Sequence, residues 1–305
     1  MKYSKPALSF EQQAQRLIDR GLIVEDKSIL VQCLSQINYY RLSAYWYPFK
    51  GINPKNGKEI FAPGTTFNTI WRRYMFDRDL RLLVMDGLEL IEVTILRTRM
   101  VEQFTLLHGP FCYCVRSNFN PLFPEEDYKR LLSDIDNAVN RSKEEFVARY
   151  RRKYIDEPRL PLWMAAETMT FGQLYTMFRY LHRDEQKKLA KQFNLFPPVL
   201  ESWLHTLNFI RNACAHHARL WNREIPVRPH LPQKKHHPEW YSPISFNNNR
   251  IFVVLCLMYY LLRYIDPHNN WKIRLEKLIS NYPEIPVHLM GFPERWLDSP
   301  VWNVL

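Results

Sequence analysis

Apolar side chains recur at helical spacing along most of this chain. The first example follows Ser9, which forms with Gln12 a capping box, the pairing that typically opens a helix. Phe10 and Leu17 then lie on one helical face, and Gly21 supplies a stop. The pattern therefore predicts a helix directly after Ser9.

Further periodic stretches predict helices at residues 28–38, 67–107, 125–154, 162–181, 184–192, 199–220, 247–264 and 271–281. Residues 50–64 hold three glycines and two prolines, which predicts a loop with room for a short hairpin. Alternating strand patterns are absent elsewhere, so the expected fold class is all-α. We expect an N-terminal helical region with its loop at residues 1–66, packed as one unit with a helical domain at residues 67–305.

Composition narrows the class of partner. The 305 residues are 46% hydrophobic and 14% aromatic, which is enough apolar surface for an ordered core. The net charge of +11 favours a polyanionic partner such as a nucleic acid. No apolar stretch of about 20 residues is present, and the five scattered cysteines are typical of a reducing compartment. With no recognisable secretory signal at the start, we expect a cytoplasmic protein that does not enter the membrane.

The basic excess is clustered. Residues 141–193 carry 12 basic and 7 acidic side chains, whereas residues 105–140 carry 3 and 5. Arg151, Arg152 and Lys153 end one predicted helix within the basic stretch. A solvated helix face is the alternative to a nucleic-acid surface for such a run.

The most informative segment is residues 208–223, where an apolar helix turns abruptly polar. Arg211 offers the forked donors that grip a phosphate, and His216 is the side chain best able to exchange a proton near neutral pH. On an ideal helix the two lie roughly 140° apart at about 100° per residue. Either the helix is distorted there or the site is completed across a dimer cleft. The alternative is that His216 and His217 brace the helix end.

A zinc site is a weaker hypothesis for this region. The cysteine and histidines between residues 214 and 237 lack the usual C-x2-4-C or H-x3-5-H spacing, so we expect neither a metal nor another cofactor. Lys234 and Lys235 instead indicate a basic loop able to contact phosphates.

Three charged residues interrupt the apolar helix predicted at residues 67–107. Glu89 and Glu92 are spaced i, i+3 on one face, and Arg97 follows. One of them is a candidate to orient Arg211 or His216. An ordinary salt bridge within the chain is at least as good an explanation.

Residues Arg211–Arg223 resemble the signature of the Abi-like (AbiD/AbiF) abortive-infection proteins, a bacterial phage-defence family. Its Arg-x4-His element is of the type found in HEPN ribonucleases. The resemblance continues in the same order at Lys5–Phe10, Gly21–Ile23, Ile37–Tyr45, Pro161–Glu167, Phe171–Gly172 and Met290–Pro293.

The resemblance implies an all-helical HEPN fold at residues 67–305, a homodimer, and metal-independent endoribonuclease activity in phage defence. Arg211 would hold the scissile phosphate of an RNA substrate, His216 would act as general acid or base, and Asn212 would orient one of them. His217, Glu89, Glu92 and Arg97 are supporting candidates. The candidates for RNA binding are Arg219, Arg223, Arg151, Arg152, Lys153, Lys234 and Lys235. Some members of the family work beside a small non-coding RNA, a further expected partner.

Two other hypotheses stay open. A non-catalytic RNA-binding module would bind RNA in a salt-dependent way without cleaving it. A helical module that senses a phage component would use Arg211 and His216 only to brace the fold.

Overall fold

The computed structural model describes residues 2, 6–54, 57–245 and 247–303. Lys5, on which part of the family resemblance rests, and most of the first residues, on which the expectation about a secretory signal rests, lie outside this description. The chain forms two compact units. The first comprises Met1–Leu80 with Lys277–Ile285, and the second Arg81–Glu276 with Pro286–Leu305.

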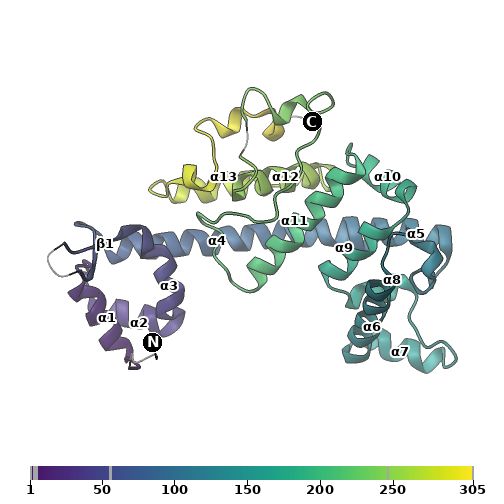
Figure 1. Ribbon diagram of the computed structural model, residues 1–305, viewed down its shortest axis with the longest axis horizontal. Coiled ribbons are helices and arrows are strands. Elements are labelled where there is room, and N and C mark those ends of the chain that lie inside the picture. Colours follow the sequence, from purple (N-terminus) through teal and green to yellow (C-terminus); the bar gives the residue numbers. More distant parts are fainter. Residues whose placement is uncertain (1, 3–5, 55–56, 246, 304–305) are drawn as a thin grey trace. The chain divides into compact units, whose positions relative to one another are not determined.

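The predicted all-α class is confirmed. Among the described residues, the only sheet is a two-stranded antiparallel hairpin, in which β1 (Lys50–Ile52) pairs with β2 (Glu59–Phe61). This hairpin lies in the loop predicted at residues 50–64. Every other regular element in the described ranges is helical (Figure 1).

The first unit begins with three helices, α1 (Phe10–Asp19), α2 (Lys27–Ile37) and α3 (Tyr39–Trp46). The predicted capping box opens α1, where the Gln12 amide donates to Ser9 Oγ at 3.2 Å and the Ser9 amide donates to Gln12 Oε1 at 2.9 Å. Gly21 follows α1 with φ of +92°, a conformation that glycine adopts without steric cost. The local sequence thus sets both ends of this helix.

The second unit contains the longest run of helix. Helix α4 (Phe67–Ile91) belongs to the second unit from Arg81 onward. It continues into a π-helix, η2 (Glu92–Met100), and then into α5 (Val101–His108). The elements after these are α6 (Glu125–Arg141), α7 (Glu145–Lys153), α8 (Leu162–Ala165), α9 (Phe171–Tyr180), α10 (Arg183–Lys191), α11 (Pro197–Ala215), α12 (Ile251–Ile265) and α13 (Trp271–Asn281, shared with the first unit). Almost every residue of α12 is buried, which explains its uniformly apolar sequence.

Four predicted helices are shorter or divided in the structure, and one of them is the helix predicted at residues 247–264, which begins only at Ile251. Residues 125–154 form α6 and α7, which are separated at residues 142–144. Residues 162–181 form α8, a short 3-10 turn and α9, because Thr170 and Gln173 make a new capping box. The helix predicted to reach Leu220 ends at Ala215. At Thr170 a cap thus interrupts an otherwise helical pattern.

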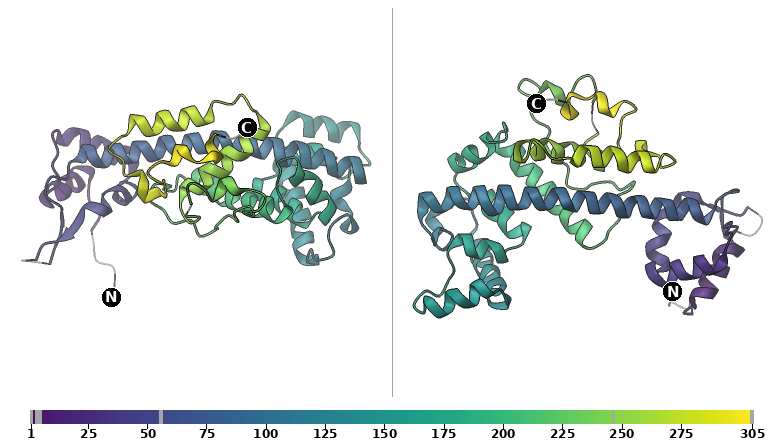
Figure 2. Two further views of the ribbon diagram at one scale, coloured as in Figure 1. Left: turned by 90° about the horizontal axis from the view of Figure 1, so that it is seen from above. Right: turned by 180° about the vertical axis from the view of Figure 1, so that it is seen from behind.

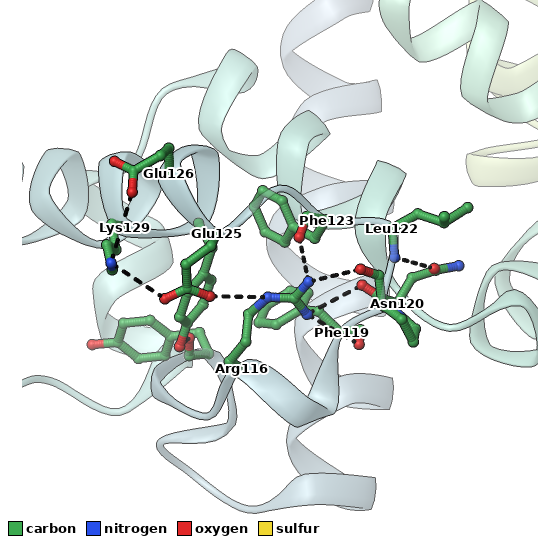
Figure 3. A network of polar contacts seen from close by, with 11 residues as sticks. Arg116, Phe119, Asn120, Leu122, Phe123, Glu125, Glu126 and Lys129 are labelled. Atoms are coloured by element: carbon green, nitrogen blue, oxygen red, sulfur yellow. Dashed lines mark hydrogen bonds and ion pairs between the residues drawn. The ribbon is translucent and has the colours of Figure 1, made fainter.

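Arg116 organises the loop that leads into α6 (Figure 3). Its guanidinium donates to the main-chain carbonyls of Phe119, Asn120, Pro121 and Phe123. It also pairs with Glu125 at 3.8 Å in the first turn of α6. This arginine is engaged in holding the loop, so the net positive charge of the chain overstates the cationic surface open to a ligand.

Candidate functional site

Helix α11 carries the Arg-x4-His element on its last turn. Ile210, Ala213 and Cys214 are buried, whereas Arg211 is half-buried and Asn212 is exposed. In the second unit α11 crosses the helix formed by the end of α4, η2 and α5, as the views in Figures 1 and 2 show. The buried residues hold α11 in the core, and its polar face is left toward this neighbour and the solvent.

The end of α11 is a Schellman motif. The His217 amide donates to the Cys214 carbonyl at 2.9 Å, and the Ala218 amide donates to the Ala213 carbonyl at 2.8 Å. His216 is the C-cap, and His217 occupies the left-handed position with φ of +55°. Histidine at a position that usually holds glycine makes the cap strained, and it fixes where the helix ends.

The π-helix aligns two of the supporting candidates. Its hydrogen bonds join residues five apart, so Glu92 and Arg97 come to the same face, whereas five residues along an α-helix diverge. Arg97 Nη2 donates to Glu92 Oε1 at 2.5 Å, and both side chains are largely buried. π-Helices are rare and occur frequently at functional sites.

Arg97 also connects η2 to the segment before α9. Its guanidinium donates to the main-chain carbonyl of Ala166, and to that of Met169 at 2.7 Å. With Glu92 accepting as well, this arginine is fully engaged within the protein. Glu92 and Arg97 therefore form the salt bridge within the chain that the sequence analysis gave as the alternative to a role at the site.

One pocket of about 480 Å³ brings Arg211 together with the supporting candidates. Its lining residues are Met85, Asp86, Leu88, Glu89, Glu92, Val93, Arg97 and Arg211. Asp86 is paired with Arg274 at 2.6 Å, and Glu92 with Arg97. Among the described residues, neither Glu89 nor Arg211 has a hydrogen bond or ion pair from its side chain. The pocket thus presents one carboxylate and one guanidinium that the protein does not neutralise.

His216 does not line this pocket. Helix α11 keeps α-helical geometry from Arg211 to Ala215, so the alternative of a distorted helix is not what the structure has. His216 is exposed, and within the part of the chain described here its ring has no hydrogen bond or ion pair. In a single chain, this pocket therefore holds Arg211 without His216.

The remaining candidates fall into separate groups. Arg219 lies over the Trp221 ring at 5.9 Å, and Arg223 lies over the Phe209 ring at 5.3 Å, both close to the end of α11. Lys234 and Lys235 are exposed in the following loop.

Arg151, Arg152 and Lys153 lie on α7, away from the end of α11 in both figures. Arg151 donates to Asn140 Oδ1 at 2.6 Å, and Lys153 lies over the Tyr154 ring at 5.1 Å. The structure does not bring this basic group to the Arg211 pocket.

Sequence reasoning missed Asn208. It lies three residues before Arg211, so the two share a face of α11, and its Oδ1 is buried without a hydrogen-bond partner among the described residues. The same amide lies beside Gly172, at 3.6 Å from the position that a Cβ would take. The spacing of three residues between Asn208 and Arg211 was the sequence signal that could have identified Asn208.

In the described ranges, no three His, Cys, Asp or Glu side chains come together as a metal site requires. No helix in those ranges has the length and apolar character needed to cross a membrane.

Fold and site together define an α-helical protein with an Arg-x4-His element at the end of a buried helix. The chain belongs to the Abi-like protein family, whose model matches residues 32–222. Membership links it to abortive infection, a form of bacterial phage defence. No curated protein and no solved structure matches the chain.

Proposed function

We propose that this protein is a metal-independent HEPN-type endoribonuclease that acts in abortive infection, with its HEPN-like domain within residues 67–305. The observation that carries the proposal is the contrast between two arginines at one pocket. Arg97 is consumed by Glu92 and two carbonyls, whereas Arg211 has no side-chain partner among the described residues. An arginine kept at a pocket without a carboxylate partner is suited to a phosphate.

The chemistry follows from the residues at the end of α11. The substrate 2′-hydroxyl oxygen attacks phosphorus, the bond from phosphorus to the 5′-oxygen breaks, and a 2′,3′-cyclic phosphate forms. His216 moves the proton that leaves the 2′-oxygen toward the departing 5′-oxygen, and Arg211 stabilises the charge on the phosphorane. Asn212, exposed between them, orients the phosphate or the imidazole.

The absence of His216 from the pocket that holds Arg211 supports a site shared by two copies. In a two-fold dimer each cleft would receive Arg211 from one protomer and His216 from its partner. Arg219 and Arg223, held over aromatic rings near the same helix end, would then flank the RNA backbone. Glu89 would hydrogen-bond one of the catalytic side chains, and His217 would support the cap.

Mixing two inactive variants tests this arrangement. Arg211→Ala and His216→Ala proteins are each expected to be inactive on RNA. If they are unfolded together and refolded as a mixture, the mixed dimers carry one intact cleft, and activity should return to about a quarter of the wild-type rate. If the refolded mixture cleaves no RNA while wild-type protein refolded in the same way is active, the shared cleft is refuted. Tight binding of intact RNA by the wild type would instead favour the non-catalytic RNA-binding module.

A further inference from the structure

Helix α3, in the first unit, presents an aromatic face that the fold does not use. Leu42, Tyr45 and Trp46 are buried and attach the helix to its unit. Tyr40 and Tyr47 are 76% and 73% exposed, which is unusual for rings of this size. At about 100° per residue the two tyrosines lie on one line, opposite the buried face and about 10 Å apart along the axis.

The backbone that carries these rings is firmly held. Tyr45 Oη donates to Asp77 Oδ2 at 2.5 Å, and Asp77 is fully buried. Asn38 caps α3 by accepting from the Tyr40 amide at 2.9 Å. Tyr47 continues the right-handed helical conformation after Trp46. The two exposed rings therefore project from a fixed support, so a ligand would not have to order the backbone.

The sequence on either side of α3 carries charge of one sign. Residues 27–58 contain five basic side chains and no acidic one. Arg41 is exposed on α3 beside Tyr40, and Lys50 and Lys58 lie on the hairpin that follows. The first acidic residue after this stretch, Glu59, is already paired with Arg20 and Lys50, each at 3.1 Å. Arg41 is therefore an exposed cation on α3 itself, and the segment that carries the two tyrosines contributes no carboxylate of its own.

We propose that this face of α3 is a binding site for single-stranded RNA, in which bases stack on Tyr40 and Tyr47 while basic side chains contact the phosphates. Flat, exposed aromatic rings within a cationic surface are the usual means of holding unpaired bases. The site is distinct from the Arg211 pocket and does not depend on nuclease activity. It would grip RNA outside the cleavage site.

The test is a binding titration with short fluorescein-labelled oligouridine, using full-length protein that carries His216→Ala so that the probe stays intact. Replacing both tyrosines by alanine should weaken binding about tenfold or more, whereas replacing both by phenylalanine keeps the rings and should change it by less than about twofold. Phe10→Ala, which removes an exposed aromatic ring at the start of α1 in the same unit, is the control and should have no effect. An abasic oligonucleotide of equal length has no bases to stack. It should therefore bind the protein with both tyrosines and the alanine variant with the same affinity.

Equal affinities of the alanine and phenylalanine variants would overturn the proposal, as would equal binding of the abasic and uridine probes. A dimer that dissociates only in the alanine variant, with unchanged RNA binding, would assign the face to a protein contact instead. Photocrosslinking of 5-iodo-oligouridine to the His216→Ala protein gives an independent readout. Crosslinks are expected between residues 39 and 49, and crosslinks found only elsewhere would contradict the site.

The two proposals can fail separately. Protein that binds oligouridine through Tyr40 and Tyr47 but never cleaves RNA would refute the nuclease and retain this site. Protein that cleaves RNA but binds oligouridine equally well without the two tyrosines would retain the nuclease and refute this site.

Discussion

Two arginines line the same pocket, and their contacts give them different roles. Arg97 has three acceptors within the protein, and Arg211 has none in the part of the chain that the structure describes. A side chain with complete internal hydrogen bonding contributes mainly to the fold. A charged side chain left without a partner at a pocket is the better candidate to contact a ligand.

This contrast predicts opposite effects on stability. Arg97→Ala leaves the largely buried Glu92 without its partner and should lower the free energy of unfolding by about 3 kcal/mol or more. Arg211→Ala removes no hydrogen bond or ion pair among the described residues, and it should change the free energy of unfolding by less than about 1 kcal/mol. Urea unfolding of both variants measures the difference. Equal losses would mean that Arg211 braces the fold, as the sensing-module hypothesis requires.

The strained cap at His217 gives a second prediction at the level of one residue. A non-glycine residue in the left-handed region costs about 1–2 kcal/mol, so His217→Gly should stabilise the end of α11 by about 1 kcal/mol. His217→Val, with a branched side chain, should destabilise it. Thermal melting checks both changes. If His217→Gly is stable and keeps its activity, His217 has no chemical role; if it is stable and inactive, both histidines take part.

At the scale of elements, Gly87 shows how closely α4 packs against its neighbours. A Cβ there would lie 2.8 Å from Trp271 Nε1 and 2.9 Å from Met258 Cε. Trp271 Nε1 donates to the Leu83 carbonyl at 2.9 Å, so the indole cannot withdraw without losing this hydrogen bond. A Cβ at this position would force the Trp271 indole or the Met258 side chain to shift.

Substituting this glycine and a second helical glycine separates packing from propensity. Alanine favours a helix over glycine by about 1 kcal/mol, but overpacking typically costs about 1–3 kcal/mol. Gly87→Ala should therefore be destabilising overall. Gly172→Ala in α9, where the nearest atoms lie at 3.6 Å, should be neutral or slightly stabilising. Unfolding measurements that ranked the two variants in the opposite order would contradict the packing at α4.

Most helices were predictable because local signals fix them. The Ser9–Gln12 box and the uniformly apolar α12 are visible in the sequence alone. The π-helix was not predictable, since hydrogen bonding five residues apart has no sequence signature. The end of α11 was misplaced because the residue in the left-handed cap is His217, and a glycine there would have marked the stop.

The residues that surround Arg211 were predictable to a similar degree. The residue types alone singled out Arg211, Glu89, Glu92 and Arg97, and the structure places all four around one pocket. The sequence did not predict which of these charges are paired within the protein. The pairing of Glu92 with Arg97 depends on the π-helix. The carbonyls of Ala166 and Met169, which also accept from Arg97, belong to a distant segment of the chain. The role of His216 stays a prediction.

At the scale of the whole molecule, buried tyrosines predict the response to alkaline pH. Burial raises the pKa of Tyr128 and of Tyr175 to about 12 in each case. Above their ordinary value near 10, the unfolded chain releases these protons while the folded chain keeps them, so stability falls as pH rises from about 10 toward about 12. Below pH 10 the contribution is fully present.

Urea unfolding at a series of pH values from about 9 to about 11 measures this loss. Tyr175→Phe removes one titrating hydroxyl without removing the ring that stacks on His205, and it should make the decline shallower. An unfolding free energy that stays constant over this range would show that the tyrosines are not buried as described.

The central claim is that Arg211 and His216 cleave RNA without a metal. The most direct measurement incubates wild-type, Arg211→Ala and His216→Ala proteins with total RNA in excess EDTA and resolves the products by length and end chemistry. Arg228→Ala and His230→Ala, at exposed positions in the loop after α11, are matched controls. We predict fragments with 2′,3′-cyclic phosphate ends from the wild type and both controls, and intact RNA from the other two variants. Intact RNA in every lane, or cleavage that persists in Arg211→Ala and His216→Ala, would contradict the account.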